Sequence, residues 1–307
     1  MKHLKWKKYT AAVLCAVTAA TAGPGLATVH ADATGTPYVS LGADLDAGQR
    51  ASVLELLGVS EADLEQYTVV TVTNEEEYEY LGDYLDAEVI GDQAISSALV
   101  VGREEGHGIQ VTTQNVTYCT VGMYQNALAT AGLKNADVTV AGPVKVTGTA
   151  ALIGVMKAYS EMTGTPVEAT KIDAATDELI TTGDLGQSLG DTEQAENLVA
   201  AVKEAVVAED ISDPDRISQL IDNAAEGLGI HLTEEEKQQI IELMQKIAGL
   251  DINVDDLKSQ VQAIYDKLAN MDLNITEEDV QGFFETIGNW FGSLWDRISS
   301  WLGGLFG

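Results

Sequence analysis

The order of strand-like and helix-like runs constrains the fold of this chain more than any other feature of its sequence. From residue 35 to about residue 175 the two kinds of run alternate. For example, the β-branched run Thr68–Thr73 is followed by a helical stretch that ends near Tyr84. After about Asp191 the strand-like runs stop and only helical spacing continues. We therefore predict an α+β protein. An N-terminal α/β domain with a mixed sheet is followed by a C-terminal helical domain and an amphipathic aromatic helix.

Within the α/β part, two β-rich runs lie on either side of a glycine-containing turn. They are Ser97–Gly102 and Ile109–Val116, and together they predict a hairpin. Helical spacing covers Val121–Ala131 and Thr149–Met162, and a glycine follows closely after each stretch, which is typical of a helix C-terminus. A turn is expected at Gly142-Pro143, ahead of the second of these helices.

The part after Asp191 predicts four helices. The first covers Thr192–Ala208, and the second begins at Pro214, a residue favoured in the first helical turn. Thr233 with Glu236 three residues later forms a capping-box pattern for the third helix. The fourth is expected around Val254–Ala269. Gly58-Val59-Ser60-Glu61 shows a similar helix-start pattern within the α/β part.

Residues 1–31 have the pattern of a cleavable signal peptide. Four lysines and no acid lie in the first eight residues, and an apolar stretch from Thr10 to about Ala22 is too short to span a bilayer. The stretch Val29-His30-Ala31 suits a signal peptidase, so cleavage is expected between Ala31 and Asp32. We therefore expect a secreted, extracellular protein that can associate with the cell surface. Its expected parts are the signal peptide 1–31, an α/β domain 32–190, a helical domain 191–275 and a C-terminal helix 276–307.

The charge of the mature chain argues against nucleic acid as a partner. Four of the 17 Lys and Arg residues lie in the signal peptide, so 13 remain beside 48 acids, a formal charge of −35. Phosphate backbones and anionic lipid surfaces would be repelled by this charge. Cys119 is the one cysteine left after cleavage, so no internal disulfide can form, and its apolar neighbours predict a buried, inert thiol.

Several stretches of the chain carry a family resemblance. The longest are Met123–Gly132 and Val146–Leu152 with Met156–Tyr159. The others are Leu41–Leu45 with Gln49-Arg50, Thr73–Glu77 and Ile95–Ser97. Together they resemble the bacterial exported family catalogued as domain of unknown function 1002. The resemblance implies an exported protein of a Gram-positive bacterium. The family has no established activity, so the resemblance implies no mechanism.

No catalytic residues, metal ligands or cofactors are predicted. Gly186–Gly190 matches the G-x-S-x-G pattern of hydrolases, but the polar stretch Asp177–Asp184 before it does not suit the strand that a nucleophile elbow requires. We interpret Ser188 as part of a linker. His107 and His231 have no second ligand at metal spacing and are expected in solvated turns.

A weak ligand-binding candidate lies where the helix at Thr149–Met162 begins. Thr147, Gly148 and Thr149 form a strand-to-helix junction whose free backbone N–H groups could hold an anion. The alternative is a plain N-cap formed by Thr147 or Thr149.

The C-terminal helix contains all four phenylalanines of the chain and three of its four tryptophans. Its apolar face repeats with helical period, and small or polar residues lie behind it. It can pack as core, lie on a membrane surface or dock on a protein partner. The residues expected to make these contacts are Phe283, Phe284, Ile287, Trp290, Phe291, Leu294, Trp295, Ile298, Trp301 and Leu302.

These features favour an exported, non-enzymatic binding or envelope-associated protein. Its C-terminal helix would bind a membrane or a protein partner, while the ligand itself stays unknown. The alternative is an unrecognised enzyme with a site in the α/β domain near Thr147–Thr149. Several acids facing one cleft of that domain would favour the enzyme.

Overall fold

The computed structural model describes residues 36–252 and Leu257, which belong to one contact unit, Asp32–Gly307. Three predicted features lie outside the described residues. They are the signal peptide with its cleavage site at Ala31 and Asp32, the helix at Val254–Ala269 apart from Leu257, and the whole aromatic helix 276–307.

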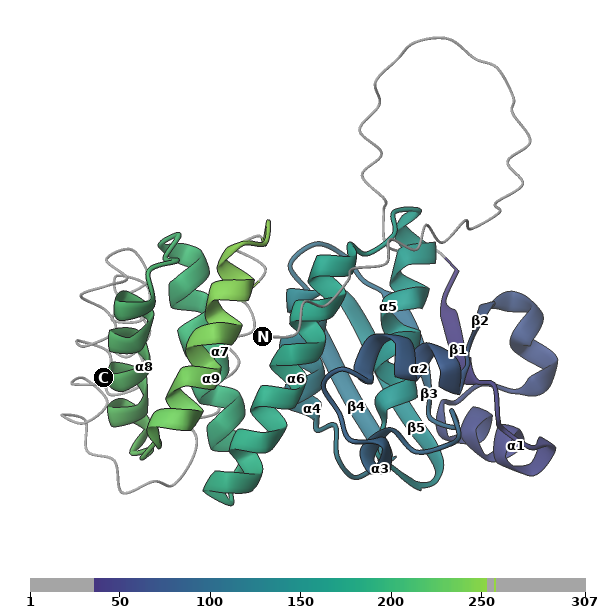
Figure 1. The fold of residues 1–307 in the computed structure, drawn as a ribbon. Helices are drawn as coiled ribbons and strands as arrows, with labels where there is room; N and C mark the ends of the chain where they lie inside the picture. Colours follow the sequence, from purple (N-terminus) through teal and green to yellow (C-terminus); the bar gives the residue numbers. More distant parts are fainter. Residues whose placement is uncertain (1–35, 253–256, 258–307) are drawn as a thin grey trace, which may run out of the picture. The chain divides into compact units, whose positions relative to one another are not determined.

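Five strands form one mixed sheet in the order β2-β1-β3-β5-β4 (Figure 1). β1 is parallel to β2 and β4 is parallel to β5, whereas β3 is antiparallel to both of its neighbours. The mixed sheet and the helices that follow it confirm the predicted α+β class. The strands are β1 Tyr38–Gly42, β2 Thr68–Val72, β3 Ser97–Gly102, β4 Ile109–Val116 and β5 Ala136–Val146.

The predicted hairpin is wrong because β3 and β4 are not neighbours in the sheet. β5 lies between them and pairs with β3 on one side and with β4 on the other. Helix α4 (Val121–Thr130) connects β4 to β5 and so makes them parallel. β1 and β2 are joined in the same way, through α1 (Ala47–Leu56) and the 3₁₀ helix η1 (Glu61–Gln66), whose N-cap is Ser60.

The two faces of the sheet are covered by different helices. Val39 and Leu41 of β1 belong to the small core that includes Val53 and Leu54 of α1. Ser40, between them, faces α5 (Thr149–Thr163), where a Cβ at Gly154 would lie 1.9 Å from the Ser40 hydroxyl oxygen. α4 and α5 therefore cover the face opposite α1, and Gly154 permits the close approach of α5.

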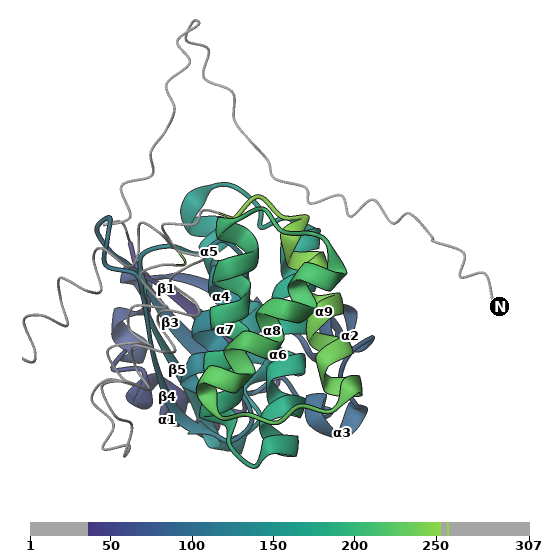
Figure 2. The same cartoon turned by 90° about the vertical axis from the view of Figure 1, so that its left-hand side faces the viewer.

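The last four helices are α6 Ala169–Leu189, α7 Thr192–Ala208, α8 Pro214–Leu228 and α9 Glu234–Ala248. α7, α8 and α9 contact one another, and α6 contacts both α7 and α9 (Figure 2). α6 also packs on α4. The predicted helices at 192–208, from Pro214, and after Thr233 are confirmed, including the Thr233–Glu236 capping box.

α6 was not expected, and the linker interpretation of Ser188 is wrong. Gly183 and Gly186 interrupt the helical pattern in the sequence, but both serve close packing. A Cβ at Gly183 would lie 2.8 Å from the Tyr118 hydroxyl, and a Cβ at Gly186 would lie 2.8 Å from the Thr192 Cα. Ser188 is exposed near the end of α6, and its hydroxyl donates to Glu236.

Two local predictions need correction at the start of helices. Thr73, the last residue of the run predicted as strand-like, is the N-cap of α2 (Asn74–Leu81): its hydroxyl accepts from the Glu76 N–H, and the Glu76 carboxylate accepts from the Thr73 N–H. Gly142-Pro143 is not a turn between elements. Both residues lie within β5, where the pairing with β4 jumps from Gln114 opposite Ala141 to Val116 opposite Val146. Among the described residues, no helix combines the length and apolar character needed to cross a membrane.

Candidate functional site

A cleft of about 270 Å³ lies where the predicted ligand-binding segment is found. Thr147 and Thr149 line it, and buried Gly148 lies between them. Other parts of the lining come from α2, from the short helix α3 (Ala87–Ile90) and from the loop between α3 and β3. Its polar side chains are those of Glu77, Glu88, Asp92, Gln93, Ser96, Thr117, Lys145, Thr147 and Thr149.

α5 begins in this cleft, but neither threonine caps it. Gly148 is the N-cap, with φ +101°, and a Cβ there would lie 2.5 Å from the Tyr124 hydroxyl. Because glycine has no capping side chain, Ser96 takes the role, and its hydroxyl accepts from the Ala151 N–H at 2.9 Å. The Tyr124 hydroxyl donates to the Gly148 carbonyl at 2.6 Å, and this hydrogen bond holds the backbone at the start of α5 in place.

Glu77 connects α2 to the start of α5. It lies in the first turn of α2 and is only 1% exposed, one helical turn before buried Leu81. The Thr149 hydroxyl donates to Glu77 Oε1 at 2.7 Å, and the Asn74 amide donates to Oε2 at 3.3 Å. Asn74 also donates to the Gly91 carbonyl at 3.3 Å, so it connects α2 to the loop after α3, which also lines the cleft.

Burial raises the pKa of Glu77 to about 7, because the ionised carboxylate loses contact with water. The hydrogen bonds from Thr149 and Asn74 lower it, and the charge of Asp44 raises it further. Near neutral pH, the carboxyl group therefore populates both forms. It accepts hydrogen bonds when ionised, and it both donates and accepts when protonated.

Two potential nucleophiles next to Gly148, Cys119 and Tyr124, are both buried. Cys119 is buried as predicted, and burial raises the pKa of its thiol to about 12. Tyr124 is also fully buried, and burial holds its pKa well above the usual value. These two residues therefore support the junction and do not react from it.

The remaining sequence candidates lie away from the cleft. His107 Nε2 lies within hydrogen-bonding distance of Asp137 Oδ1, at 2.7 Å, and Arg103 forms an ion pair with the same carboxylate at the turn before β4. His231 is exposed just ahead of the α9 cap. In the part of the chain that the structure describes, no group of three or more His, Cys, Asp or Glu side chains could hold a metal ion.

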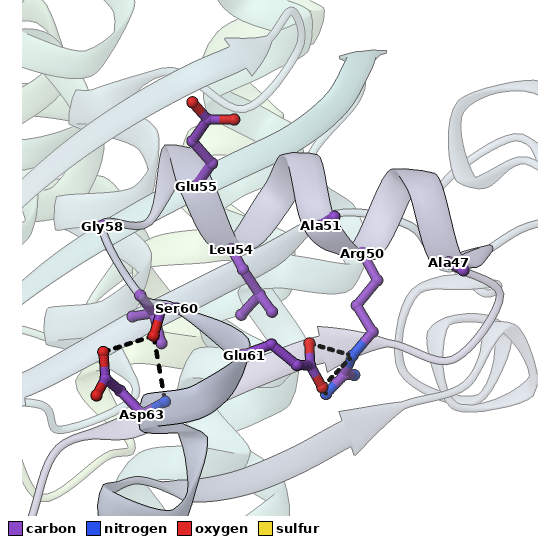
Figure 3. A pocket seen from close by; sticks show the side chains of 10 residues that line it. Ala47, Arg50, Ala51, Leu54, Glu55, Gly58, Ser60, Glu61 and Asp63 are labelled. Atoms are coloured by element: carbon purple, nitrogen blue, oxygen red, sulfur yellow. Dashed lines mark hydrogen bonds and ion pairs between the residues drawn. The ribbon is translucent and has the colours of Figure 1, made fainter.

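A larger hollow, about 750 Å³, lies between α1 and η1 (Figure 3). Leu54 points into it, and Arg50 reaches across to Glu61, which it meets at 3.1 Å. The two charged side chains are 35% and 66% exposed, so their pairing is a solvated surface contact. We favour the smaller cleft as the functional site because it holds a buried ionisable group.

Sequence reasoning found Thr147–Thr149 but missed Glu77, Ser96 and Lys145. Glu77 stands in the run Glu75-Glu76-Glu77, where any acid suits the N-terminus of a helix. Its spacing from Leu81 could have indicated that Glu77 is buried. Glu77 lies four residues before Leu81 and therefore shares the buried face of α2. The predicted contact residues of the aromatic helix, Phe283 to Leu302, lie outside the described residues.

Comparison with known proteins gives one family and one curated relative for this chain. The family model described as "Protein of unknown function (DUF1002)" matches residues 41–264, which include the whole cleft. The "Uncharacterized protein YpuA" of Bacillus subtilis (strain 168) is 35% identical over 269 residues. That match covers 87% of this chain and 90% of the relative. No solved structure matches.

Proposed function

The chain belongs to the DUF1002 family of proteins of unknown function, and from that premise we propose that it is an exported, non-enzymatic binding protein whose ligand site is the Glu77 cleft. The proposal keeps the expectation that residues 276–307 attach the protein to a membrane or to a protein partner. The cleft would then present its ligand-binding groups outside the cell.

The observation that carries the proposal is the burial of Glu77 beside an open cleft. A carboxylate at 1% exposure costs folding free energy unless it is protonated or well paired. Its raised pKa reflects that cost. Strongly perturbed ionisable groups that line a cleft concentrate at binding and catalytic sites. A purely structural position one turn before Leu81 would be filled at lower cost by an apolar residue.

Binding is favoured over catalysis by the way the cleft is built. Both carboxylate oxygens of Glu77 accept hydrogen bonds from neighbours, which holds the group in place. The one thiol nearby is buried. A binding protein requires only fixed, complementary groups, whereas a catalyst also needs a group that reaches the reacting atom.

An enzyme with its site in the same cleft is the second candidate, and one observation favours it. Glu77, Glu88 and Asp92 all line the cleft, which is the gathering of acids that an enzyme of the α/β part would show. In that case Glu77, with a pKa of about 7, would act as a general acid or base near neutral pH.

A thermal-shift screen of small polar metabolites tests the binding proposal. We expect at least one compound to raise the melting temperature of the wild-type protein, and Glu77→Gln to abolish the shift. Glu79→Gln is the matched control, because Glu79 is exposed on the same helix and does not line the cleft. Shifts that survive Glu77→Gln, or no shift from any compound, would rule out this cleft as the site.

Two further measurements separate the remaining parts of the proposal. NMR of the bound compound over several hours should show no new product, and product that appears with wild type but not with Glu77→Gln would establish the enzyme instead. For export, the full-length chain should be expressed in a Gram-positive host. N-terminal sequencing of protein from the medium should begin at Asp32. Protein that stays in the cell fraction with residues 1–31 still attached would contradict secretion.

A further inference from the structure

The charged groups of the Glu77 cleft are separated by segment. All of its acids come from residues 77–92, on α2, on α3 and in the loop after α3: Glu77, Glu88 and Asp92. Its one basic side chain, Lys145, comes from the end of β5, four residues before α5 begins at Thr149. The acids that line the cleft thus come from one segment of the chain, and the positive charge comes from another.

The positive side of the cleft includes backbone as well as Lys145. Thr149 and Ala150, the first two residues of α5, both line the cavity. Their N–H groups have no acceptor within the helix, because the first four N–H groups of any α-helix lack one. The third, that of Ala151, is taken by Ser96. The partial positive charge of the helix end is therefore added to that of Lys145.

The size of the cleft limits what it can take. Drug-sized ligands occupy pockets of about 300–1,000 Å³, and this cavity measures about 270 Å³. A nucleotide or a sugar chain is too large to be enclosed. A bare metal ion is also disfavoured, since the described residues bring no three ligating side chains together.

We propose that the cleft binds a small zwitterion of amino-acid size, with its ammonium group at the acids Glu77, Glu88 and Asp92 and its carboxylate at Lys145 and the first turn of α5. This inference rests on the proposed binding function and adds the ligand class. A zwitterion can pair with both the acids and the positive groups of the lining, whereas a simple amine or a simple carboxylate pairs with one kind and meets the like charge of the other.

Titration of the ¹⁵N-labelled protein with four matched probes tests the ligand class by amide chemical shifts. The probes are L-alanine, D-alanine, ethylamine, which lacks the carboxylate, and propionate, which lacks the ammonium group. We expect one alanine enantiomer or both to move the amide signals of Thr149 and Ala150. Ethylamine and propionate should bind about tenfold more weakly or worse.

Two variants locate the contacts. Lys145→Met should weaken alanine binding towards that of ethylamine and should not weaken ethylamine binding, because only the carboxylate meets Lys145. Glu77→Gln should weaken alanine and ethylamine alike, and Glu79→Gln should change neither. Lys145 is exposed, so its replacement leaves the fold intact and keeps the test valid if Glu77→Gln proves unstable.

The outcomes distinguish a wrong ligand class from a wrong site. Ethylamine or propionate binding as tightly as alanine would overturn the zwitterion while leaving the cleft as a binding site. Alanine shifts confined to residues outside the cleft would also overturn it. If none of the four probes binds, the zwitterion is again overturned. The metabolite screen with Glu77→Gln then decides separately whether the cleft binds anything.

Discussion

At the scale of single residues, Glu77 shows how three adjacent acids can differ. Glu75, Glu76 and Glu77 all lie in the first turn of α2, where the helix end favours negative charge. Glu76 forms the capping box with Thr73 and pairs with Lys157, and these contacts lower its pKa despite partial burial. Glu77 turns inward, and burial raises its pKa. The difference comes from the direction each side chain takes on the helix.

The first prediction concerns stability and Glu77. Its pKa is about 7 in the folded protein against 4.5 for an unperturbed glutamate, so the folded state binds more protons between those values. Stability is therefore full below about pH 4.5 and falls as pH rises through 7, by about 3 kcal/mol in total. Glu77→Gln should remove this loss, making the variant relatively more stable at pH 8 than at pH 5.

Urea unfolding at pH 5 and pH 8 measures this effect, with Glu79→Gln as the control that keeps the wild-type slope. Groups with lowered pKa values, such as Glu76, Asp137 and Glu236, act in the opposite direction and at lower pH, where their stabilisation is lost on acidification. They therefore do not mask the Glu77 effect. Equal pH dependence in wild type and Glu77→Gln would show that Glu77 is not buried.

At the scale of elements, a buried ion pair joins α6 to α7. Lys203 and Glu178 are 1% and 0% exposed, and their charged atoms meet at 2.7 Å. Lys203 also donates to the Asn126 carbonyl at 2.9 Å and to the Thr130 hydroxyl at 3.1 Å, both on α4. The Thr130 hydroxyl donates in turn to Glu178. These polar side chains and the Asn126 carbonyl thus connect α4, α6 and α7 through buried hydrogen bonds and one ion pair.

The second prediction follows from that burial. Lys203→Met should lower the free energy of unfolding by about 3–5 kcal/mol, because it removes the positive charge that pairs with the buried Glu178 carboxyl. Adding Glu178→Leu should recover most of the loss. Lys237→Met is the matched control, since its partner Asp222 is 60% exposed, and it should cost under about 1 kcal/mol. A double variant no more stable than Lys203→Met would contradict this account.

The third prediction concerns the aromatic helix expected at residues 276–307. It has almost no basic residues, so membrane binding would rest on Trp and Phe insertion and depend little on salt. The mature chain should co-sediment with vesicles of neutral lipid, and a chain ending at Ile275 should stay in solution while remaining folded. If neither chain sediments and the shorter one unfolds, the aromatic face is core. A steep loss of binding with salt would count against insertion.

At the scale of the whole molecule, the features that could be predicted from the sequence are those determined by residues close together in the chain. The caps of α9 and η1, the bounds of α7 and the burial of Cys119 all follow from local pattern. The position of β5 between β3 and β4 does not, because strand pairing is settled by contacts between distant residues. α6 was missed for the same reason, since its glycines make sense only beside Tyr118 and Thr192.

The candidate site likewise has one part that could be predicted from the sequence and one that could not. Its Thr147–Thr149 segment was visible as a strand-to-helix junction, but its acids belong to residues 77–92, far away in the sequence. The two parts come together only because α5 packs against β1, β2 and α2 across the sheet. The boundary expected near residue 190 stays a prediction, and α6, which ends there at Leu189, contacts both α4 and α7.

The most direct test of the central claim is the titration of the Glu77 carboxyl carbon by NMR. The signal would be assigned in ¹³C-glutamate-labelled protein by its absence from Glu77→Gln. This structure predicts a midpoint near pH 7, and a bound ligand with an ammonium group should lower it, because a nearby positive charge favours the ionised carboxylate. A midpoint near 4.5 that no ligand moves would mean that Glu77 is a solvated surface acid and that the cleft is not the site.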